Sequence, residues 1–444
     1  MAEIELFHQL AELAAFELEP HRPEIGLDFV ESSHSQVVQS GDDAVEGLHE
    51  ITSGGYSIAM TPDDLREAIA SKARAVGFDK VGFAPARLPA SDSDALKTWL
   101  ARGYQGDMEW MARAAERRTD ASRSLEGALT LVCCGLNYYR GAPVSAPPGS
   151  GVISSYAQGE DYHRVLGEKL KEVAAFIEAR ASVPTRIYVD TGPLLEKSYA
   201  AAAGLGWVGK HSNLLLRLGS SWFFLGEILV PMALEPSAAE RNHCGTCTRC
   251  IAACPTGAIV APYVVDSNLC ISYLTIELRG FVPRELRPLI GNRIYGCDDC
   301  QDVCPWNRFA AKSDVPAFLP KEPLASMDLE AILRMSRQEF LEATRGSAIR
   351  RARYAGFLRN AAIALGNARE PRSVPALVEA LAHEEALVRG HAAWALGVIG
   401  DFRASVPLSS RLGQESDARV KDEIEWALAE LSRSARPRRP RASS

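Results

Sequence analysis

The sequence predicts an α+β protein built from three consecutive parts: an α/β domain, a cysteine-rich domain and a set of α-helical repeats. Three observations support this prediction. Amphipathic helical segments alternate with short apolar strands over residues 61–240, cysteines cluster within 241–320, and a small-residue motif recurs within 321–435. Hydrophobic residues form 47% and charged residues 24% of the 444-residue chain, as expected for a globular protein with several cores.

Two charged segments flank this body. Residues 1–60 hold twelve acidic residues and a single base, Arg22, and we interpret them as an acidic extension, a misassigned start or a regulatory flap. Residues 436–444 form a basic tail that we expect to be disordered. The sequence has no run of 18 apolar residues and no secretion signal, which predicts a cytoplasmic protein without a membrane span.

The first domain begins with a helix-start signature. Thr61 is a suitable N-cap, Pro62 suits the first helical position, and acidic residues follow, so we expect a helix over 62–76. Further helices are predicted at 162–180 and 194–203. Strands are predicted at 80–83, 128–136, 185–189 and 222–230. Cys133 and Cys134 fall within the second strand, where we expect them to be buried as small apolar residues.

The C-terminal part contains a repeat. The tripeptide at 364–366 (Ala-Leu-Gly) recurs 31 residues later at 395–397, and a related Ala-Leu-Ala follows at 427–429. Small residues at matching positions let helices pack closely, and this period suits stacked helical hairpins of HEAT type.

The cysteine spacing predicts two metal clusters. Cys244, Cys247, Cys250 and Cys254 form a C-x2-C-x2-C-x3-C-P run, in which the last cysteine ligates the neighbouring cluster of a bacterial-ferredoxin-like domain. A second run lacks its leading cysteine, which Cys270 can supply. We therefore expect two sets of four ligands, one of Cys244, Cys247, Cys250 and Cys304, the other of Cys254, Cys270, Cys297 and Cys300.

Two [4Fe–4S] clusters are the chemistry that this pattern favours. A pair of zinc sites is the alternative, because four thiolates also suit Zn²⁺. Zinc sites rarely combine the Cys-Pro ending with crossed ligation, and reduced thiols in an intracellular chain point to metal rather than disulfides. Clusters by themselves carry electrons, so a reaction centre must lie elsewhere.

Several local motifs resemble one family, the epoxyqueuosine reductases. They are Val-Asp-Thr-Gly-Pro-Leu-Leu-Glu-Lys at 189–197, Gly-Trp-Val-Gly-Lys-His-Ser-Asn-Leu at 206–214, Phe-Leu-Gly-Glu at 224–227 and Tyr-Gly-Cys-Asp-Asp-Cys-Gln at 295–301. The resemblance runs from Thr61 into the helical repeats and does not cover the acidic extension.

The resemblance implies a cobalamin-dependent oxidoreductase of queuosine biosynthesis. Two [4Fe–4S] clusters would pass electrons to a base-off cob(II)alamin, giving strongly reducing Co(I). The epoxide of epoxyqueuosine at the tRNA wobble position would then become the alkene of queuosine, with the protein positioning the reactants. The implied partners are the tRNA anticodon stem–loop and an electron donor such as a flavodoxin or ferredoxin, and the expected state is a monomer.

Asp190 is the proton donor that the resemblance implies. Expelling oxygen requires protonation, and a buried carboxyl group can supply a proton when its pKa is raised. Asp190 follows the strand predicted at 185–189, and strand ends commonly meet ligands. From the residues alone, Asp190 fits equally well as the N-cap of the next helix.

Further cofactor contacts are implied with it. The cobalamin-binding set is Arg118, Ser154, Asp190, Leu214, Leu225, Ser272, Cys297 and Asp298. Ser154 stands where some family members have cysteine, and Lys197 where some have arginine, which keeps the charge and loses the planar fork. His163 is interpreted as an ordinary histidine at a helix start, since the family leaves cobalt without a protein ligand.

An arginine-rich stretch suggests the RNA side of the protein. The arginines are Arg345, Arg350, Arg351, Arg353 and Arg359, and no acidic residue separates them. Guanidinium groups neutralise phosphates, although a solvated helix face explains the same stretch. Arg279 and Arg284, close to the cysteines, are further candidates to hold the anticodon loop, whose wobble base must leave its stack.

Two other functions compete with this one. A reductive dehalogenase would share the corrinoid and the twin clusters, but such enzymes are typically exported and lack helical repeats. A non-catalytic iron–sulfur electron carrier would use the repeats only for docking, and would bind no corrinoid.

Overall fold

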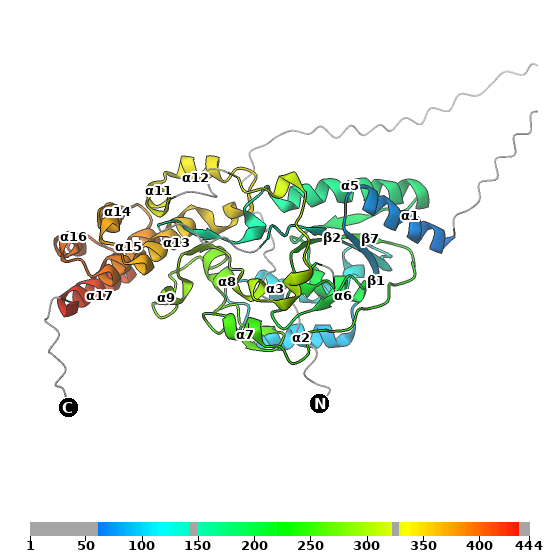
Figure 1. The fold of residues 1–444 in the computed structure, drawn as a ribbon, viewed down its shortest axis with the longest axis horizontal. Helices are drawn as coiled ribbons and strands as arrows, with labels where there is room; N and C mark the ends of the chain where they lie inside the picture. Colours follow the sequence, from blue (N-terminus) through cyan, green and yellow to red (C-terminus); the bar gives the residue numbers. More distant parts are fainter. Residues whose placement is uncertain (1–60, 142–148, 218, 322–327, 435–444) are drawn as a thin grey trace, which may run out of the picture.

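The computed structural model describes residues 61–141, 149–217, 219–321 and 328–434 (Figure 1). The predicted acidic extension and basic tail lie outside these described residues. A small β-sheet covered by helices lies at one end of the molecule, stacked helices lie at the other, and cysteine-bearing elements lie between them (Figure 1).

The sheet has four strands in the order β1-β2-β7-β4, and every neighbouring pair is antiparallel. The strands are β1 (Lys80–Pro85), β2 (Thr130–Asn137), β7 (Phe223–Val230) and β4 (Arg186–Tyr188). The predicted α+β class is confirmed. Cys133 and Cys134 are fully buried in β2, as the apolar run predicted. The observed bounds of the first helices and strands lie close to the predicted ranges, because each element has a clear start and a buried face.

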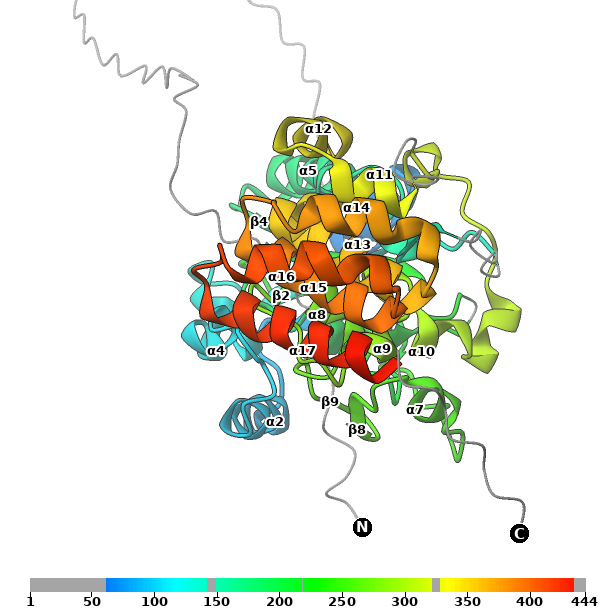
Figure 2. The ribbon, with the colours of Figure 1, turned by 90° about the vertical axis from the view of Figure 1, so that its left-hand side faces the viewer.

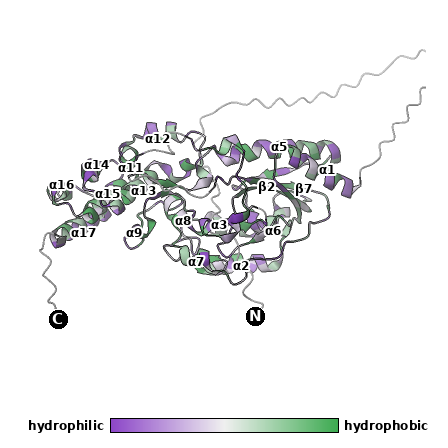
Figure 3. Ribbon diagram, in the orientation of Figure 1, coloured by the Kyte–Doolittle hydropathy of each residue, from purple (hydrophilic) through white to green (hydrophobic). Residues whose placement is uncertain are grey.

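Three helices enclose the sheet: α1 (Pro62–Ala75), α5 (Tyr162–Ala181) and α6 (Glu196–Ala202). Thr61 caps α1 through a reciprocal pair of bonds with Asp64. In Figure 1, α1 and α5 lie above the sheet and α6 lies below it. Polar and apolar segments alternate along α1 and α5 (Figure 3), as expected for helices with one buried face.

The same domain contains further elements, most of them short, that sequence reasoning did not predict. They are α2 (Ala90–Ala101), α3 (Trp110–Arg113), α4 (Ala115–Thr119), β3 (Val152–Ile153), β5 (Trp207–Val208) and β6 (Leu214–Leu215). Strands of two residues leave no periodic signal, and α3 and α4 are single turns.

The cysteine-rich part consists of short helices and hairpins. Its elements are α7 (Arg249–Ala253), β8 (Ile259–Ala261), β9 (Val264–Val265), α8 (Ile271–Ile276), α9 (Arg287–Ile290), β10 (Arg293–Tyr295) and α10 (Asp299–Asp302). Strand β10 pairs in parallel with β3 of the first domain. This pairing fixes the cysteine-bearing loops against the sheet domain.

Stacked helices form the C-terminal part (Figure 2). They are α11 (Leu329–Arg334), α12 (Arg337–Ala343), α13 (Arg353–Ala368), α14 (Val374–Ala380), α15 (Ala386–Ile399), α16 (Ser405–Leu412) and α17 (Ala418–Ser434). The repeated glycines explain how closely they stack. A Cβ atom on Gly366 would lie 2.9 Å from Ala395, and one on Gly397 would lie 2.8 Å from Ala427. The predicted HEAT-like repeats are therefore confirmed, with the small residues at the helix contacts.

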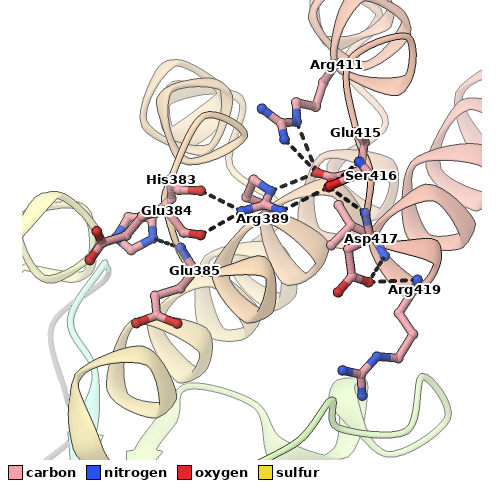
Figure 4. Close-up of polar contacts among 10 residues, drawn as sticks. His383, Glu384, Glu385, Arg389, Arg411, Glu415, Ser416, Asp417 and Arg419 are labelled. Carbon is pink, nitrogen blue, oxygen red and sulfur yellow. Dashed lines mark hydrogen bonds and ion pairs between the residues drawn. The ribbon is translucent and has the colours of Figure 1, made fainter.

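A buried ion pair ties consecutive repeats together (Figure 4). Nε and Nη2 of Arg389 donate to the two carboxylate oxygens of Glu415 at 2.7 and 2.9 Å, and Arg411 donates to the same carboxylate. The hydrogen bonds from Arg389 and from the backbone beyond Glu415 hold the pKa of that carboxyl group well below its usual range. The Glu415 carboxylate thus links α15 to the start of α17 through its ion pair with Arg389.

The repeats and the cysteine-rich part form a continuous polar interface. Asn360 on α13 donates to the carbonyls of Thr275 and Ile294, each at 2.8 Å. Glu423 on α17 accepts two bonds from the buried guanidinium of Arg287, at 2.6 and 2.9 Å. The helical stack is therefore held against the cysteine-bearing loops rather than attached by a free linker.

Candidate functional site

The structure places the two predicted cysteine sets around two separate cavities. Cys244, Cys247, Cys250 and Cys304 line a cavity of about 410 Å³, together with Trp306. Cys304 comes from the second run, so the crossed pattern is present in the geometry. Burial, and then the neighbouring thiol of Cys244, raise the pKa of Cys250 to about 11. Four such thiolates require a positively charged centre to stay ionised together.

The second cavity is lined by the other set. Cys254, Cys270, Cys297 and Cys300 surround a volume of about 480 Å³ with mostly apolar walls. The backbone N–H of Ala258 donates to the sulfur of Cys254 at 3.2 Å, a contact typical of cluster ligands. Within the described ranges, no group of three or more His, Cys, Asp or Glu side chains is placed to hold a metal ion. The sulfurs line cavities instead of meeting at one point, and Cys270 lines the same cavity as the two leading cysteines of the second run, Cys297 and Cys300.

A third and larger cavity lies beside the second cysteine set. Its volume is about 820 Å³, and Ser272 lines both this cavity and the one formed by Cys270, Cys297 and their partners. Aromatic side chains form much of its wall, among them Tyr138, Tyr156 and Phe224. Three of the predicted cofactor contacts line this cavity: Asp190, Leu225 and Ser272. This cavity therefore adjoins the cavity of the second cysteine set.

The remaining predicted contacts are distributed around this centre. Ser154 donates to the carboxylate of Asp298 at 2.5 Å, which joins β3 to the loop that carries Cys297. Arg118 is buried beneath the ring of Trp110, with its guanidinium carbon 5.0 Å from the ring centre. Leu214, on β6, is buried but is absent from the linings of the three cavities described above.

Asp190 follows β4 in a conformation that L-residues rarely adopt, with φ of 57°. Its backbone N–H donates to Glu196 at 2.5 Å, and the hydroxyl of Tyr162 donates to its Oδ2 atom. Helix α6 starts at Glu196 with Leu195 as its N-cap. The N-cap alternative for Asp190 is therefore wrong, because its carboxylate lines the large cavity instead of capping a helix.

Buried acids surround the Asp190 loop, and sequence reasoning assigned them no role. Burial, and then the charge of Asp190, raise the pKa of Glu196 to about 8. Burial, and then the charge of Glu196, raise the pKa of Glu227 well above its ordinary value. Both residues belong to the motifs quoted above, but only the packing of α6 on β7 brings them together.

His163 occupies the first turn of α5, as predicted, and it also reaches the Asp190 carboxylate. Its Nδ1 atom lies 2.7 Å from Asp161 and its Nε2 atom 3.5 Å from Oδ2 of Asp190. Burial lowers the pKa of His163, but the hydrogen bonds with Asp161 and Asp190 outweigh it and raise that pKa to about 9.

The arginine stretch divides into exposed and buried members. Arg345, Arg350 and Arg353 are exposed, whereas Arg351 is ion-paired with Glu277. Arg359 is fully buried and donates only to groups inside the protein, so its expected role at the RNA surface is wrong. The sequence alone does not show which of these arginines are buried in the core.

Comparison with known proteins places this geometry in a family. The model described as epoxyqueuosine reductase QueG matches residues 118–191, a 4Fe–4S double cluster binding domain matches 243–307, and HEAT repeats match 344–429. An epoxyqueuosine reductase of Escherichia coli is 44% identical over 326 residues, covering 72% of this chain and 86% of the relative. One of Xanthomonas campestris is 41% identical, covering 76% and 97%.

The chain belongs to the epoxyqueuosine reductase family. It is therefore an oxidoreductase, and its cysteine-rich part is an iron–sulfur domain for two clusters rather than a pair of zinc sites. The alternatives of a reductive dehalogenase and of a non-catalytic electron carrier are wrong.

Solved structures of this family agree with the fold. A Bacillus subtilis epoxyqueuosine reductase, with its catalytic loop swung out of the active site, matches with a TM-score of 0.76 at 32% identity over 83% of this chain and 99% of that one. An epoxyqueuosine reductase with an epoxyqueuosine-modified tRNA stem loop matches with a TM-score of 0.77 at 33% identity, with the same coverage. In the part of the chain that the structure describes, no helix has the length and apolar character needed to cross a membrane.

Proposed function

We propose that this chain reduces epoxyqueuosine to queuosine at the wobble position of a tRNA, using a cobalamin held in the large cavity. The observation that supports this most strongly is that Ser272 lines both the cavity of the second cysteine set and the larger cavity that contains Asp190. Electrons would enter at the set containing Cys244, pass to the set containing Cys270, and leave into this cavity.

The residues of the cavity suit a base-off cobalamin. The walls combine aromatic rings with apolar residues, including Tyr138, Phe224 and Leu225, which can pack against a corrin plane. Among the described residues that line it, none is a histidine or a cysteine, so the walls would offer a bound cobalt ion neither an imidazole nor a thiolate. Bound there, the cofactor supplies the low-potential electrons for opening the epoxide.

Asp190 is the proton donor in this proposal. It is buried at 7% exposure and faces the cavity, and the N–H···O bond to Glu196 holds its backbone in place. Tyr162 and His163 both approach its Oδ2 atom, and the proposal assigns Oδ1 to the substrate oxygen. A carboxyl group in this position protonates the departing oxygen and spares the reaction an oxide leaving group.

The tRNA and the electron donor have separate surfaces in the same proposal. The similar structure with a tRNA stem loop supports binding of an anticodon stem–loop, and Arg345, Arg350 and Arg353 supply exposed positive charge for its phosphates. A flavodoxin or ferredoxin would dock near Cys244 and Cys247, which are only partly buried. We further propose that the enzyme acts as a monomer in the cytoplasm.

The test uses the full chain, loaded anaerobically with iron, sulfide and cobalamin, and a tRNA that carries the epoxide. Asp190→Asn should lower turnover by about 10²- to 10⁴-fold, the usual contribution of a general acid, while iron content stays unchanged. Asp94→Asn, which alters an exposed carboxylate on α2, is the matched control and should keep the wild-type rate. Near-normal turnover by Asp190→Asn would exclude Asp190 as the donor.

A further inference from the structure

The reduction proposed above consumes two protons, and Asp190 can hold only one. Opening the epoxide breaks both C–O bonds and forms a C=C bond. Two electrons enter from the metal centres, and the oxygen leaves as water after taking up two protons. A single carboxyl group must therefore be protonated again during each turnover, or a second donor must exist. This inference rests on the proposed function, and it concerns the origin of the second proton.

His163 is the titratable side chain that best connects Asp190 with solvent. Its Nε2 atom lies 3.5 Å from Oδ2 of Asp190, and its Nδ1 atom lies 2.7 Å from Oδ1 of Asp161. Exposure increases outward along this row, from 9% for the side chain of Asp190 to 20% for His163 and 23% for Asp161. The three side chains therefore form a graded path from the buried carboxylate to the surface.

Two different hollows meet at this row. Asp190 and Tyr162 line the large inner cavity, whereas Asp161 and His163 line a second hollow of about 910 Å³. The inner lining does not include His163, and the outer lining does not include Asp190. A proton that enters from the outer hollow can thus reach the inner cavity through the contact between the imidazole and the carboxylate.

We propose that His163, oriented by Asp161, passes protons from the outer hollow to Asp190, so that one carboxyl group delivers both protons of the reduction. His163 is a positioning and proton-supplying residue in this scheme, because it acts through Asp190 and not on the substrate. After Asp190 gives its first proton to the epoxide oxygen, the Nε2–H proton moves to Oδ2. The neutral ring keeps its Nδ1 proton, so it must turn about its Cβ–Cγ bond to take up a new proton at Nε2 from water in the outer hollow, and then turn back towards Asp190.

The local charges keep His163 protonated until it is needed. The hydrogen bonds with Asp161 and Asp190 outweigh burial and raise the pKa of His163 to about 9, so it is an imidazolium at neutral pH. Asp161 accepts from both the ring and the backbone N–H of His163, which fixes the ring orientation. The titratable and charged groups that face His163 are Asp161, Tyr162, Lys171, Asp190 and Glu196.

The buried acids behind Asp190 are less suited to this task. Glu196 accepts a hydrogen bond from the backbone N–H of Asp190, so it fixes the loop and does not contact the carboxylate by that bond. Glu227 is fully buried on β7, and neither glutamate lines the outer hollow. They hold the loop in place, while His163 provides the exchange with solvent.

The experiment compares His163→Ala and His163→Gln with the loaded wild-type enzyme from pH 6 to 10. In both variants kcat should fall by about 10- to 100-fold, which is at or below the lower end of the effect usually seen when a general acid or base is removed. The KM for the tRNA should not change. Added imidazole should restore His163→Ala, and the restoration should fade as the pH rises above the ordinary imidazole pKa of about 6.5. His383→Gln, a histidine of the repeats, is the matched control.

A second readout does not depend on turnover. NMR titration of His163 should give a pKa near 9 in the wild type and a lower value in Asp161→Asn. The proposal is overturned if His163→Ala keeps the wild-type rate and pH profile. It is also overturned if His163→Ala loses activity and added imidazole does not restore it at any pH. Asp190→Asn is run in parallel. Near-normal turnover by this variant would exclude Asp190 as the proton donor of the proposed function, whereas an inactive Asp190→Asn beside fully active His163 variants would refute only the relay.

Discussion

Arg359 offers a sharp test of the fold, because two interpretations of it predict opposite results. Its guanidinium donates to the carbonyls of Leu274, Leu278 and Gly280 at 2.7, 2.8 and 2.9 Å, and its Nε donates to Asn360. Burial lowers the pKa of Arg359 to about 9, the opposite of what a solvated phosphate-binding arginine would show. The residue thus joins α13 to α8 and to the chain that follows it.

The perturbation is Arg359→Met, which keeps most of the side-chain volume and removes every donor. One buried carbonyl (Leu274) and two half-buried ones (Leu278 and Gly280) then lose their donor, and each buried group left unsatisfied costs about 1–3 kcal/mol. Partial relaxation and water entry reduce the sum, so we expect a loss of about 3–5 kcal/mol in the free energy of unfolding. Such a loss is a large fraction of the total stability of a domain.

The assay is urea unfolding followed by tryptophan fluorescence, together with tRNA binding at two salt concentrations. Arg345→Met, in the same stretch but exposed, is the control and should change stability by less than about 0.5 kcal/mol. Arg345→Met should instead weaken tRNA binding and lower the salt slope by about 1. The reasoning is refuted if Arg359→Met unfolds within about 1 kcal/mol of wild type while its tRNA affinity falls.

Three further changes test other parts of the structure. Cys270→Ala should lower the iron content from about eight to about four per chain, whereas Cys133→Ala should retain all of it; equal iron in both variants would show that Cys270 is no ligand. Glu415→Gln should cost about 3–5 kcal/mol at neutral pH, because it breaks a buried ion pair. The folded-state pKa of Glu415 is lowered, so its stabilising contribution exists above the unfolded value of about 4.3 and fades as the pH falls below it. The difference in the free energy of unfolding between Glu415→Gln and wild type, measured in urea, should therefore shrink as the pH falls. Glu425→Gln, on the exposed face of α17, is the control and should match wild type. A difference for Glu415→Gln that does not change with pH would contradict this account. Gly366→Ala should lower the free energy of unfolding by about 1–3 kcal/mol through overpacking, since its Cβ would lie 2.8 Å from Trp394. Gly413→Ala is the control and should be tolerated, because the nearest atom to its Cβ would be 3.6 Å away. Equal thermal midpoints of the two variants would refute the packing argument.

The elements with strong local signals were predictable from the sequence. Strand β2 has a continuous apolar run, α1 has its N-cap box, and the repeat glycines mark the helix contacts. The cysteine spacing also carried enough information to predict the two sets that the structure gathers around two cavities. In each case the information lies within a few residues or in an exact period.

The features that depend on distant contacts were not predictable. Glu196 and Glu227 meet only because α6 packs on β7, and His163 reaches Asp190 only because the chain after β4 turns back towards α5. Arg359 looked like its neighbours in the sequence, yet the close contact of α13 with α8 buries it. Such residues show their roles only when the tertiary structure is known.

The most direct test of the account is a single-turnover assay on epoxyqueuosine tRNA with the anaerobically reconstituted enzyme, reduced chemically, with and without cobalamin. Nucleoside analysis by mass spectrometry would measure the conversion. The account predicts conversion to queuosine in proportion to the cobalamin bound, and none in its absence. Equal conversion without any corrinoid, or none with both clusters and cobalamin in place, would contradict the proposed path from the cysteine sets through the cavity to Asp190.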